Sequence, residues 1–242
     1  MKKPIFSPCT CNNENNKTEI GKIQRYSKDD NKFAEWEPLL VCVDCHLRQN
    51  KGFVISLSRG GTLVYHHNVI DENERGEVCT FMDQCDLFRQ YKTNGFNEPR
   101  VHVLLSSFAQ PLDGGDCGNN RNKMGPGYGY HGIRMRALPI KIAPPVESFA
   151  AKLAAKFNLP NNLWSIGVDL MTYRGGKDRI GWHADDNQGE EMIVTVVVET
   201  DPRRIVKIRP KKKKCKHESY HDGDEQIELI VTRGNGYRMN GM

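Results

Sequence analysis

A histidine and an aspartate are separated by one residue in the stretch GWHADD, residues 181–186. On an extended strand, positions i and i+2 lie on the same face, so the His183 imidazole and the Asp185 carboxylate can converge on one point. One imidazole nitrogen and one carboxylate oxygen are two of the three ligands in the two-histidine, one-carboxylate set that holds non-haem Fe(II). The spacing therefore indicates a pair of iron ligands; the alternative is a surface His–Asp pair at a turn.

Two close cysteine pairs lie in the polar first part of the chain, Cys9 with Cys11 in SPCTCNN and Cys42 with Cys45 in LLVCVDCHLRQ. Four thiolates on two tight turns could offer a tetrahedral site to zinc, which would supply cohesion that so polar a segment lacks. The alternative is a set of thiols in a partly disordered leader. We therefore expect a Cys-containing leader over residues 1–58, able to bind zinc, and a separate domain over residues 59–242.

The segments that must position His183 and Asp185 are mostly predicted strands. The runs 163–173, 191–199, 203–210 and 225–233 are apolar or β-branched and are separated by Gly-, Asp-, Pro- and Lys-containing turns. Short strands at this spacing favour an antiparallel sandwich or barrel. Residues 62–70 predict one further strand upstream.

Two segments have helical periodicity. Residues 71–91 begin with acidic residues, and residues 144–158 carry Pro145 and Glu147 in the first turn, which suits the start of a helix. We interpret the periodic side chains as packing faces. They are Val78, Phe81, Met82, Cys85 and Phe88 in the first helix, and Val146, Phe149, Leu153 and Phe157 in the second.

The charge pattern and the N-terminus limit the partners and the compartment. The chain of 242 residues has a formal net charge of +5, and the run KKKKCK at 211–216 favours a polyanionic partner unless it is only a solvated face. The N-terminus lacks an apolar signal region, and no apolar run is long enough to span a bilayer. We expect an intracellular protein of the nucleus or cytoplasm, whose eight cysteines serve as thiols or metal ligands.

The run YRGGKDRIGWHADD, residues 173–186, resembles the signature of the AlkB-like 2-oxoglutarate- and Fe(II)-dependent dioxygenases. Upstream, EPR (98–100), GYGYHG (127–132) and PPVESFAAKLA (144–154) resemble the family's Pro-Arg motif, aromatic lid segment and helix before the jelly roll, in the same order. Downstream, IVTRGNGYRMNGM (230–242) resembles the strand ahead of the second metal histidine. The resemblance covers about residues 60–242 of this sequence.

This resemblance implies a mainly β fold with flanking helices, built on a double-stranded β-helix or jelly roll. It implies that His183 and Asp185 bind Fe(II) and that Tyr173 hydrogen-bonds a carboxylate of 2-oxoglutarate. It also implies that Tyr128, Tyr130 and His131 lie near the substrate mouth, where aromatic faces could stack an extruded base. Ordinary packing beside a glycine-rich turn is the alternative for these three residues.

Two departures from the family pattern affect the site. Met171 stands where the family often has an asparagine, and a thioether cannot donate a hydrogen bond to a carboxylate. The family's second metal histidine and its carboxylate-binding arginine do not occur in register before Met242. We therefore expect a chain truncated at its C-terminus, without the last strands of the jelly roll; loss of catalysis is the alternative. Cys215, His217 and His221 are further candidate metal ligands. They lie in a lysine-rich hairpin, however, which we expect to contact solvent or phosphate.

The expected function is hydroxylation of a C–H bond by an Fe(II)- and 2-oxoglutarate-dependent enzyme, acting in the oxidative dealkylation of N-alkylated nucleic acid. One alternative is a non-catalytic zinc- and nucleic-acid-binding module on a degenerate dioxygenase scaffold. Another is a hydroxylase with a protein or small-molecule substrate. Iron that is lost on His183→Ala would favour the enzyme, and zinc that is unaffected by it would favour the module.

Overall fold

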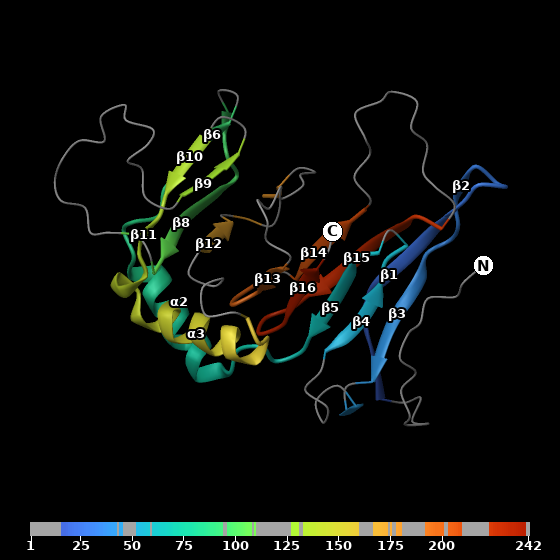
Figure 1. Cartoon of the computed structure of the whole chain (residues 1–242), viewed down its shortest axis with the longest axis horizontal. Coiled ribbons are helices and arrows are strands. Elements are labelled where there is room, and N and C mark those ends of the chain that lie inside the picture. The colour runs from blue at the N-terminus through green and yellow to red at the C-terminus, as the bar shows by residue number, and fades with distance from the viewer. Residues whose placement is uncertain are drawn as a thin grey trace. The chain divides into compact units, whose positions relative to one another are not determined.

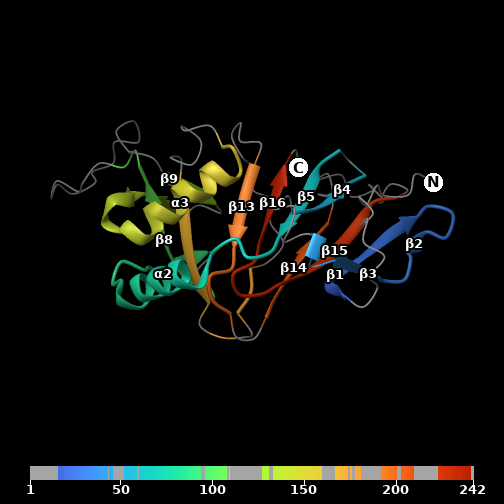
Figure 2. The same ribbon diagram turned by 90° about the horizontal axis from the view of Figure 1, so that it is seen from below.

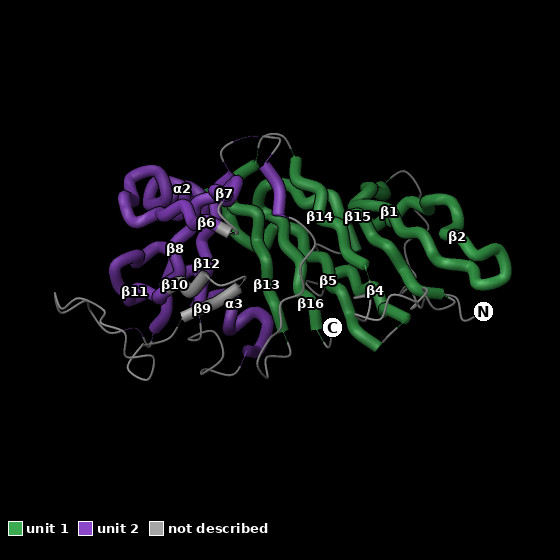
Figure 3. The backbone as a smooth tube through the Cα atoms, turned by 90° about the horizontal axis from the view of Figure 1, so that it is seen from above, with its two compact units in different colours: residues 1–72, 184–242 green, residues 73–183 purple. Residues whose placement is uncertain are grey.

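The structure, a computed structural model, divides into two compact units, residues 1–72 with 184–242 and residues 73–183 (Figure 3). It is mainly β, with flanking helices and curled antiparallel sheets, which confirms the coarse fold class predicted from the sequence. The residues that it describes are 16–42, 44–45, 52–58, 60–93, 96–107, 109, 127–130, 133–159, 167–173, 175, 178–180, 192–200, 203–209 and 223–240.

The first sheet of the unit formed by residues 1–72 and 184–242 is organised around a long, central strand near the N-terminus (Figure 1). This strand pairs antiparallel with a strand about two hundred positions later, Gly21 standing opposite Leu229. The strands of this sheet are β14 (Arg204–Ile208), β15 (Glu225–Val231), β1 (Lys17–Ser27) and β3 (Glu37–Cys42), with β2 (Lys32–Phe33) paired to the end of β1.

A bulge in β1 depends on Gly21, whose φ is +154°. The register with β3 shifts between Glu19 and Gly21. A Cβ atom at position 21 would lie 2.1 Å from the carbonyl oxygen of Glu228 in the neighbouring strand. The close approach of the two backbones therefore requires glycine here.

The second sheet of the same unit also consists of antiparallel pairs. Figure 2 shows three of its strands, β13, β16 and β5, running side by side. In order across the sheet, the strands are β13 (Met192–Val196), β16 (Gly236–Asn240), β5 (Thr62–His66) and β4 (Phe53–Ser56).

Both sheets of this unit contribute side chains to one apolar core. Ile23 of β1 and Leu229 of β15 come from the first sheet, and Leu63 and Tyr65 of β5 come from the second. In β15 the burial alternates strictly, because odd positions face the core and even positions face away. The two sheets therefore pack face to face around this core.

The N-terminal segment takes part in this sandwich, which differs from the expected boundary between residues 58 and 59. β4 pairs with β5 across that boundary, and β1 pairs with β15. Ile20, Ile23 and Leu39 are buried in the shared core. The described part of residues 17–56 is therefore part of the larger sheet system and is held by apolar burial rather than standing apart as a polar leader.

The unit formed by residues 73–183 has a three-stranded sheet centred on β8 (Arg100–Ser106). β12 (Val168–Tyr173) lies antiparallel to β8 on one side, and β11 (Leu138–Pro139) lies parallel to it on the other. Two small hairpins complete the strands of the described region: β6 (Lys92–Thr93) with β7 (Phe96–Asn97), and β9 (Gly127–Tyr130) with β10 (Ile133–Arg136).

Helix α3 (Pro144–Lys156) follows a single 3-10 turn, η3 (Ile140–Ile142), and confirms the helix predicted at 144–158. Proline at its first position and Glu147 in its first turn suit its N-terminus. Val146, Phe149 and Phe157 of the predicted packing face are buried, and Leu153 is partly buried. An ion pair between Lys152 and Glu74 joins α3 to the helix beside it in Figure 1.

Helix α2 (Glu72–Gln84) is shorter than the predicted segment 71–91, and Val78 is its one fully buried side chain. The prediction was wrong at the C-terminal end because Arg89 leaves the helical path and bonds to β8. Its amide donates to the carbonyl of His102 at 3.1 Å, and the His102 amide donates to the carbonyl of Arg89 at 3.0 Å. Within the described residues, no helix combines the length and the apolar character needed to cross a membrane.

Candidate functional site

A buried layer of polar side chains lies on one face of the β8–β12 pair. In the antiparallel register, Met171 stands opposite His102 and Tyr173 stands opposite Arg100. Opposite residues in such a pair project to the same side, and so do alternate residues along each strand. Asp169, Met171 and Tyr173 of β12 therefore share one face with Arg100 and His102 of β8.

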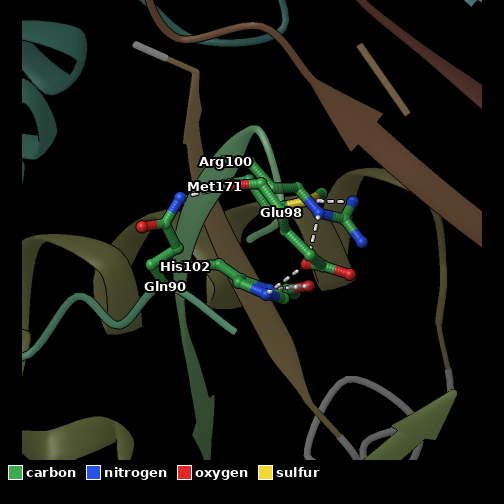
Figure 4. A network of polar contacts seen from close by, with 6 residues as sticks. Gln90, Glu98, Arg100, His102 and Met171 are labelled. Carbon is green, nitrogen blue, oxygen red and sulfur yellow. Dashed lines mark hydrogen bonds and ion pairs between the residues drawn. The ribbon is translucent and has the colours of Figure 1, made fainter. Parts of the chain in front are cut away.

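His102 is fully buried at the centre of this layer, with 0% of its surface exposed. Its Nδ1 lies 3.2 Å and 3.3 Å from the two carboxylate oxygens of Asp169. Its Nε2 lies 3.5 Å from Oε2 of Glu98 (Figure 4). The hydrogen bond of the ring is therefore the one at Nδ1 to Asp169, whereas the approach of Nε2 to Glu98 is an ion-pair distance without hydrogen-bond geometry.

Arg100 at the start of β8, and Glu98 two positions before it, extend the layer. The Nε of Arg100 donates to Oε2 of Glu98 at 3.4 Å, and its Nη1 lies 3.2 Å from the sulfur of Met171 (Figure 4). Both side chains are almost completely buried, which makes their pairing necessary because an isolated buried charge is costly. Gln90 donates from its side chain to the backbone carbonyl of Glu98 and holds that turn in place.

Tyr91 closes the layer next to His102. The two rings meet edge to face, with 5.0 Å between their centroids. Burial raises the pKa of the Tyr91 phenol, the charge of Asp169 raises it further, and Arg89 lowers it in part. The phenol therefore stays protonated at neutral pH.

The arrangement of the layer does not suit a metal ion. Asp169 and Glu98 lie at opposite nitrogens of the His102 ring, so the three groups do not converge on one point. Across the part of the chain that the structure describes, no group of three or more His, Cys, Asp or Glu side chains is arranged to hold a metal. The layer is instead a charge-paired structure that fixes the side chains on its face.

The donors on this face fit a carboxylate ligand. Tyr173 offers a phenolic hydroxyl and Arg100 a guanidinium, and the two stand opposite each other in the register. Met171, next along the face, offers no donor. The chemistry expected of Tyr173 from the family resemblance is therefore compatible with its neighbours in the sheet.

The predicted iron ligands His183 and Asp185 lie outside the described residues, as do His131, Cys9 and Cys11. Tyr173 is the last residue of β12, and Tyr128 and Tyr130 occupy alternate positions of β9. Cys42 is buried at the end of β3, and Cys45 is partly buried three positions later. The zinc site and the iron site stay predictions.

The chain has no match among models of known protein families, and none among curated protein sequences.

The sequence interpretation missed the pairing of His102 with Asp169 and of Arg100 with Glu98. It noted EPR at 98–100 only as part of a family pattern, although His102 and Asp169 carried a usable signal. In RVHVLLS, Arg100 and His102 occupy alternate positions of an otherwise apolar strand and so share a face, and VDLMTY carries one charged residue, Asp169, among apolar ones. The register that brings the two strands together could not be read from either alone.

Proposed function

We propose that this chain is an Fe(II)- and 2-oxoglutarate-dependent dioxygenase that hydroxylates a C–H bond. One observation carries the proposal: β12 ends at Tyr173, on a face shared with a buried guanidinium, and the sequence then passes through the H-x-D pair to β13. Strands on both sides of the H-x-D segment are what the proposed site requires. The two packed sheets of residues 1–72 and 184–242 support a double-stranded β-helix as the finer fold.

In this proposal, His183 and Asp185 would hold the iron and Tyr173 would hold a carboxylate of 2-oxoglutarate. When bound, the iron and 2-oxoglutarate would allow dioxygen to act as the oxidant, with one oxygen atom inserted into the C–H bond and the other incorporated into succinate, which would form with carbon dioxide. The protein's own contribution is to fix the donors that orient the co-substrate. The paired charges of Glu98, Arg100 and Asp169 provide such a fixed frame, because every charge in it has a partner.

The proposed substrate is N-alkylated nucleic acid, in which hydroxylation of the adduct releases an aldehyde. The formal net charge of +5 and the lysine run at 211–216 suit a polyanion. Tyr128, Tyr130 and His131 would stack or contact the target base.

The test measures the formation of succinate from 2-oxoglutarate in the presence of Fe(II) and alkylated oligonucleotides. It compares two variants, each of which neutralises one of two neighbouring carboxylates. Asp185→Asn should abolish both iron binding and succinate formation, whereas Asp186→Asn, the matched control, should keep both. Equal effects of the two substitutions would refute the assignment of Asp185. A wild-type protein without turnover on any alkylated oligonucleotide would count against the repair role. Bound zinc that His183→Ala does not change would favour the non-catalytic binding module.

A further inference from the structure

The first sheet (Figure 1) has an outer face, turned away from the apolar core. Lys207 of β14 stands opposite Glu228 of β15, which in turn stands opposite Lys22 of β1. The even positions of β15 are its less buried ones, so Glu228 and the two lysines beside it lie on this side. Ile205 of β14 is 55% exposed, and Trp36 lies under the ammonium of Lys22. These five residues define what we call the outer face.

The two lysines of the outer face share one carboxylate. The Nζ of Lys22 lies 3.0 Å from Oε2 of Glu228, and the Nζ of Lys207 lies 2.6 Å from Oε1. One positive charge is therefore in surplus, and Arg203 adds an exposed cation directly before β14. The side chains of Lys22 and Lys207 are 41% and 56% exposed, so an anion in solution can reach both ammonium groups. The charges of this face suit a polyanion.

Trp36 gives the outer face a flat aromatic surface. Its side chain is 36% exposed, and the Nζ of Lys22 lies 4.7 Å from the ring centroid. This cation–π contact holds the indole beside the lysine pair. Lysines alone fit any polyanion, whereas lysines next to an exposed aromatic ring are the combination that binds single-stranded nucleic acid, because every base has a face that can stack. An acidic peptide would use the lysines but would have no base to place on the ring.

We propose that the outer face binds single-stranded nucleic acid, with phosphates at Lys207 and Lys22 and one base stacked on Trp36. This inference rests on the proposed function for the choice of nucleic acid, and it adds a surface that holds the strand. The phosphates compete with Glu228 for the two ammonium groups, so the carboxylate of Glu228 limits the affinity. Neutralising this carboxylate should therefore strengthen binding.

The experiment measures binding of labelled, unmodified oligothymidylate by fluorescence anisotropy, over a range of salt concentrations and without Fe(II) or 2-oxoglutarate. Lys207→Gln should reduce the slope of log affinity against log salt concentration by about 0.7, as expected for one lost phosphate contact on a single strand. Glu228→Gln should tighten binding several-fold. Lys141→Gln, at an exposed lysine outside the outer face, is the matched control and should change neither the affinity nor the slope.

Trp36 is tested with two ligands that differ only in their bases. Trp36→Leu should weaken binding of oligothymidylate by about tenfold, and Trp36→Phe, which keeps a ring, should retain most of the affinity. On an abasic oligomer of the same length, Trp36→Leu and the wild-type protein should bind equally. An equal loss on both ligands, or no loss on either, would overturn the inference, and so would a wild-type protein that does not bind oligothymidylate at low salt.

Two further outcomes would assign the outer face to another role and overturn the inference. Polyglutamate that binds as tightly as oligothymidylate, with no effect of Trp36→Leu on either ligand, would indicate an acidic protein partner. Faster aggregation of Lys207→Gln with unchanged binding would indicate that Lys207 protects the last strand of the sheet against wrong pairing.

The binding assay is separate from succinate formation, because it omits iron, co-substrate and alkylation. A protein that binds oligothymidylate through Trp36 and Lys207 but forms no succinate would refute the proposed catalysis and support the outer face as a binding surface. A protein that forms succinate with alkylated oligonucleotides, but whose affinity does not depend on Trp36 or Lys207, would refute this inference alone.

Discussion

In residues 1–72 and 184–242, the space between two sheets is filled by side chains such as Leu63, Leu229 and Val231, each with no exposed surface. In residues 73–183, the central strand β8 instead buries Arg100 and His102, with Glu98 just before it. Apolar packing has no direction, so the first interior needs only the right volume and pattern. The second interior needs each polar group to have its partner at the right distance, because an unsatisfied buried group is costly.

The difference separates an interior that stability alone explains from one that also fixes the positions of particular side chains. An apolar sandwich core is sufficiently explained by stability. A buried Arg–Glu–His–Asp layer is a weak source of stability, because burying charges offsets much of the energy gained by pairing them. A layer of this kind is better explained by the side chains that it holds in position.

The largest effect should come from opening a cavity in the apolar sandwich. Leu229→Ala removes a side chain that has no exposed surface, and we expect a loss of about 3 kcal/mol in the free energy of unfolding. The control is Ile205→Ala on the neighbouring strand β14, where the side chain is 55% exposed and the loss should be small. Urea unfolding measures both. Similar losses at the two sites would mean that the sandwich core is not the main source of stability.

A smaller effect should follow from breaking the polar layer. His102→Leu keeps an apolar side chain of similar size but leaves Asp169 and Glu98 without the imidazole, and we expect a loss of about 2 kcal/mol. His102→Asn places an amide donor near the position of Nδ1 and should be better tolerated despite its smaller volume. Urea unfolding measures the free energy of unfolding of both variants, and the order of the two values shows whether the interior around His102 requires a polar partner. If leucine were tolerated better than asparagine, the layer would behave as an ordinary apolar core.

The smallest effect concerns the exposed face of the first sheet, where Glu228 lies 3.0 Å from Lys22 and 2.6 Å from Lys207. Burial raises the pKa of Glu228, but hydrogen bonds and charges from the two lysines outweigh it, so the pKa lies below its ordinary value. The associated stability is present at neutral pH and is lost as the pH falls through the lowered pKa.

Lys207→Met should therefore cost about 0.5 kcal/mol at neutral pH, and this cost should fade toward zero as the pH falls through the lowered pKa of Glu228. Thermal unfolding across this pH range measures the change, and exposed Lys141→Met serves as the control. A cost that stayed constant with pH would show that Lys207 contributes by packing of its aliphatic chain and not by its charge.

The elements that the sequence predicted well are those with a local signal. The alternation in EQIELIVTR and the helical stripe from Val146 to Phe157 each repeat within a few residues, so β15 and α3 appear where they were expected. β1 was missed because KTEIGKIQRYS is polar and is interrupted by the Gly21 bulge. Its strand character depends on β15, about two hundred positions away, which no local window contains.

The candidate site was predictable only in part for the same reason. The position of Tyr173 at the end of a strand followed from its own segment, and β12 confirms that strand. Glu98 is close to Arg100 and His102 in the sequence, but Asp169 and Met171 come from β12. Their pairing with β8 depends on a register between segments about seventy positions apart. A charged residue within an apolar strand indicates that it needs a partner on the same face of the sheet. It does not indicate which strand supplies that partner.

The connectivity of the sandwich also has a consequence for synthesis on the ribosome. Strands β1 and β5 can pair early with β3 and β4, but their partners on the other edge, β15 and β16, emerge only after residue 224 has been added. The nascent N-terminal strands must wait with open edges, while residues 73–183 are already available to fold as a continuous stretch. The sandwich can therefore be completed only after β15 and β16 have been synthesised, and until then one edge of β1 and one edge of β5 stay open to wrong pairing.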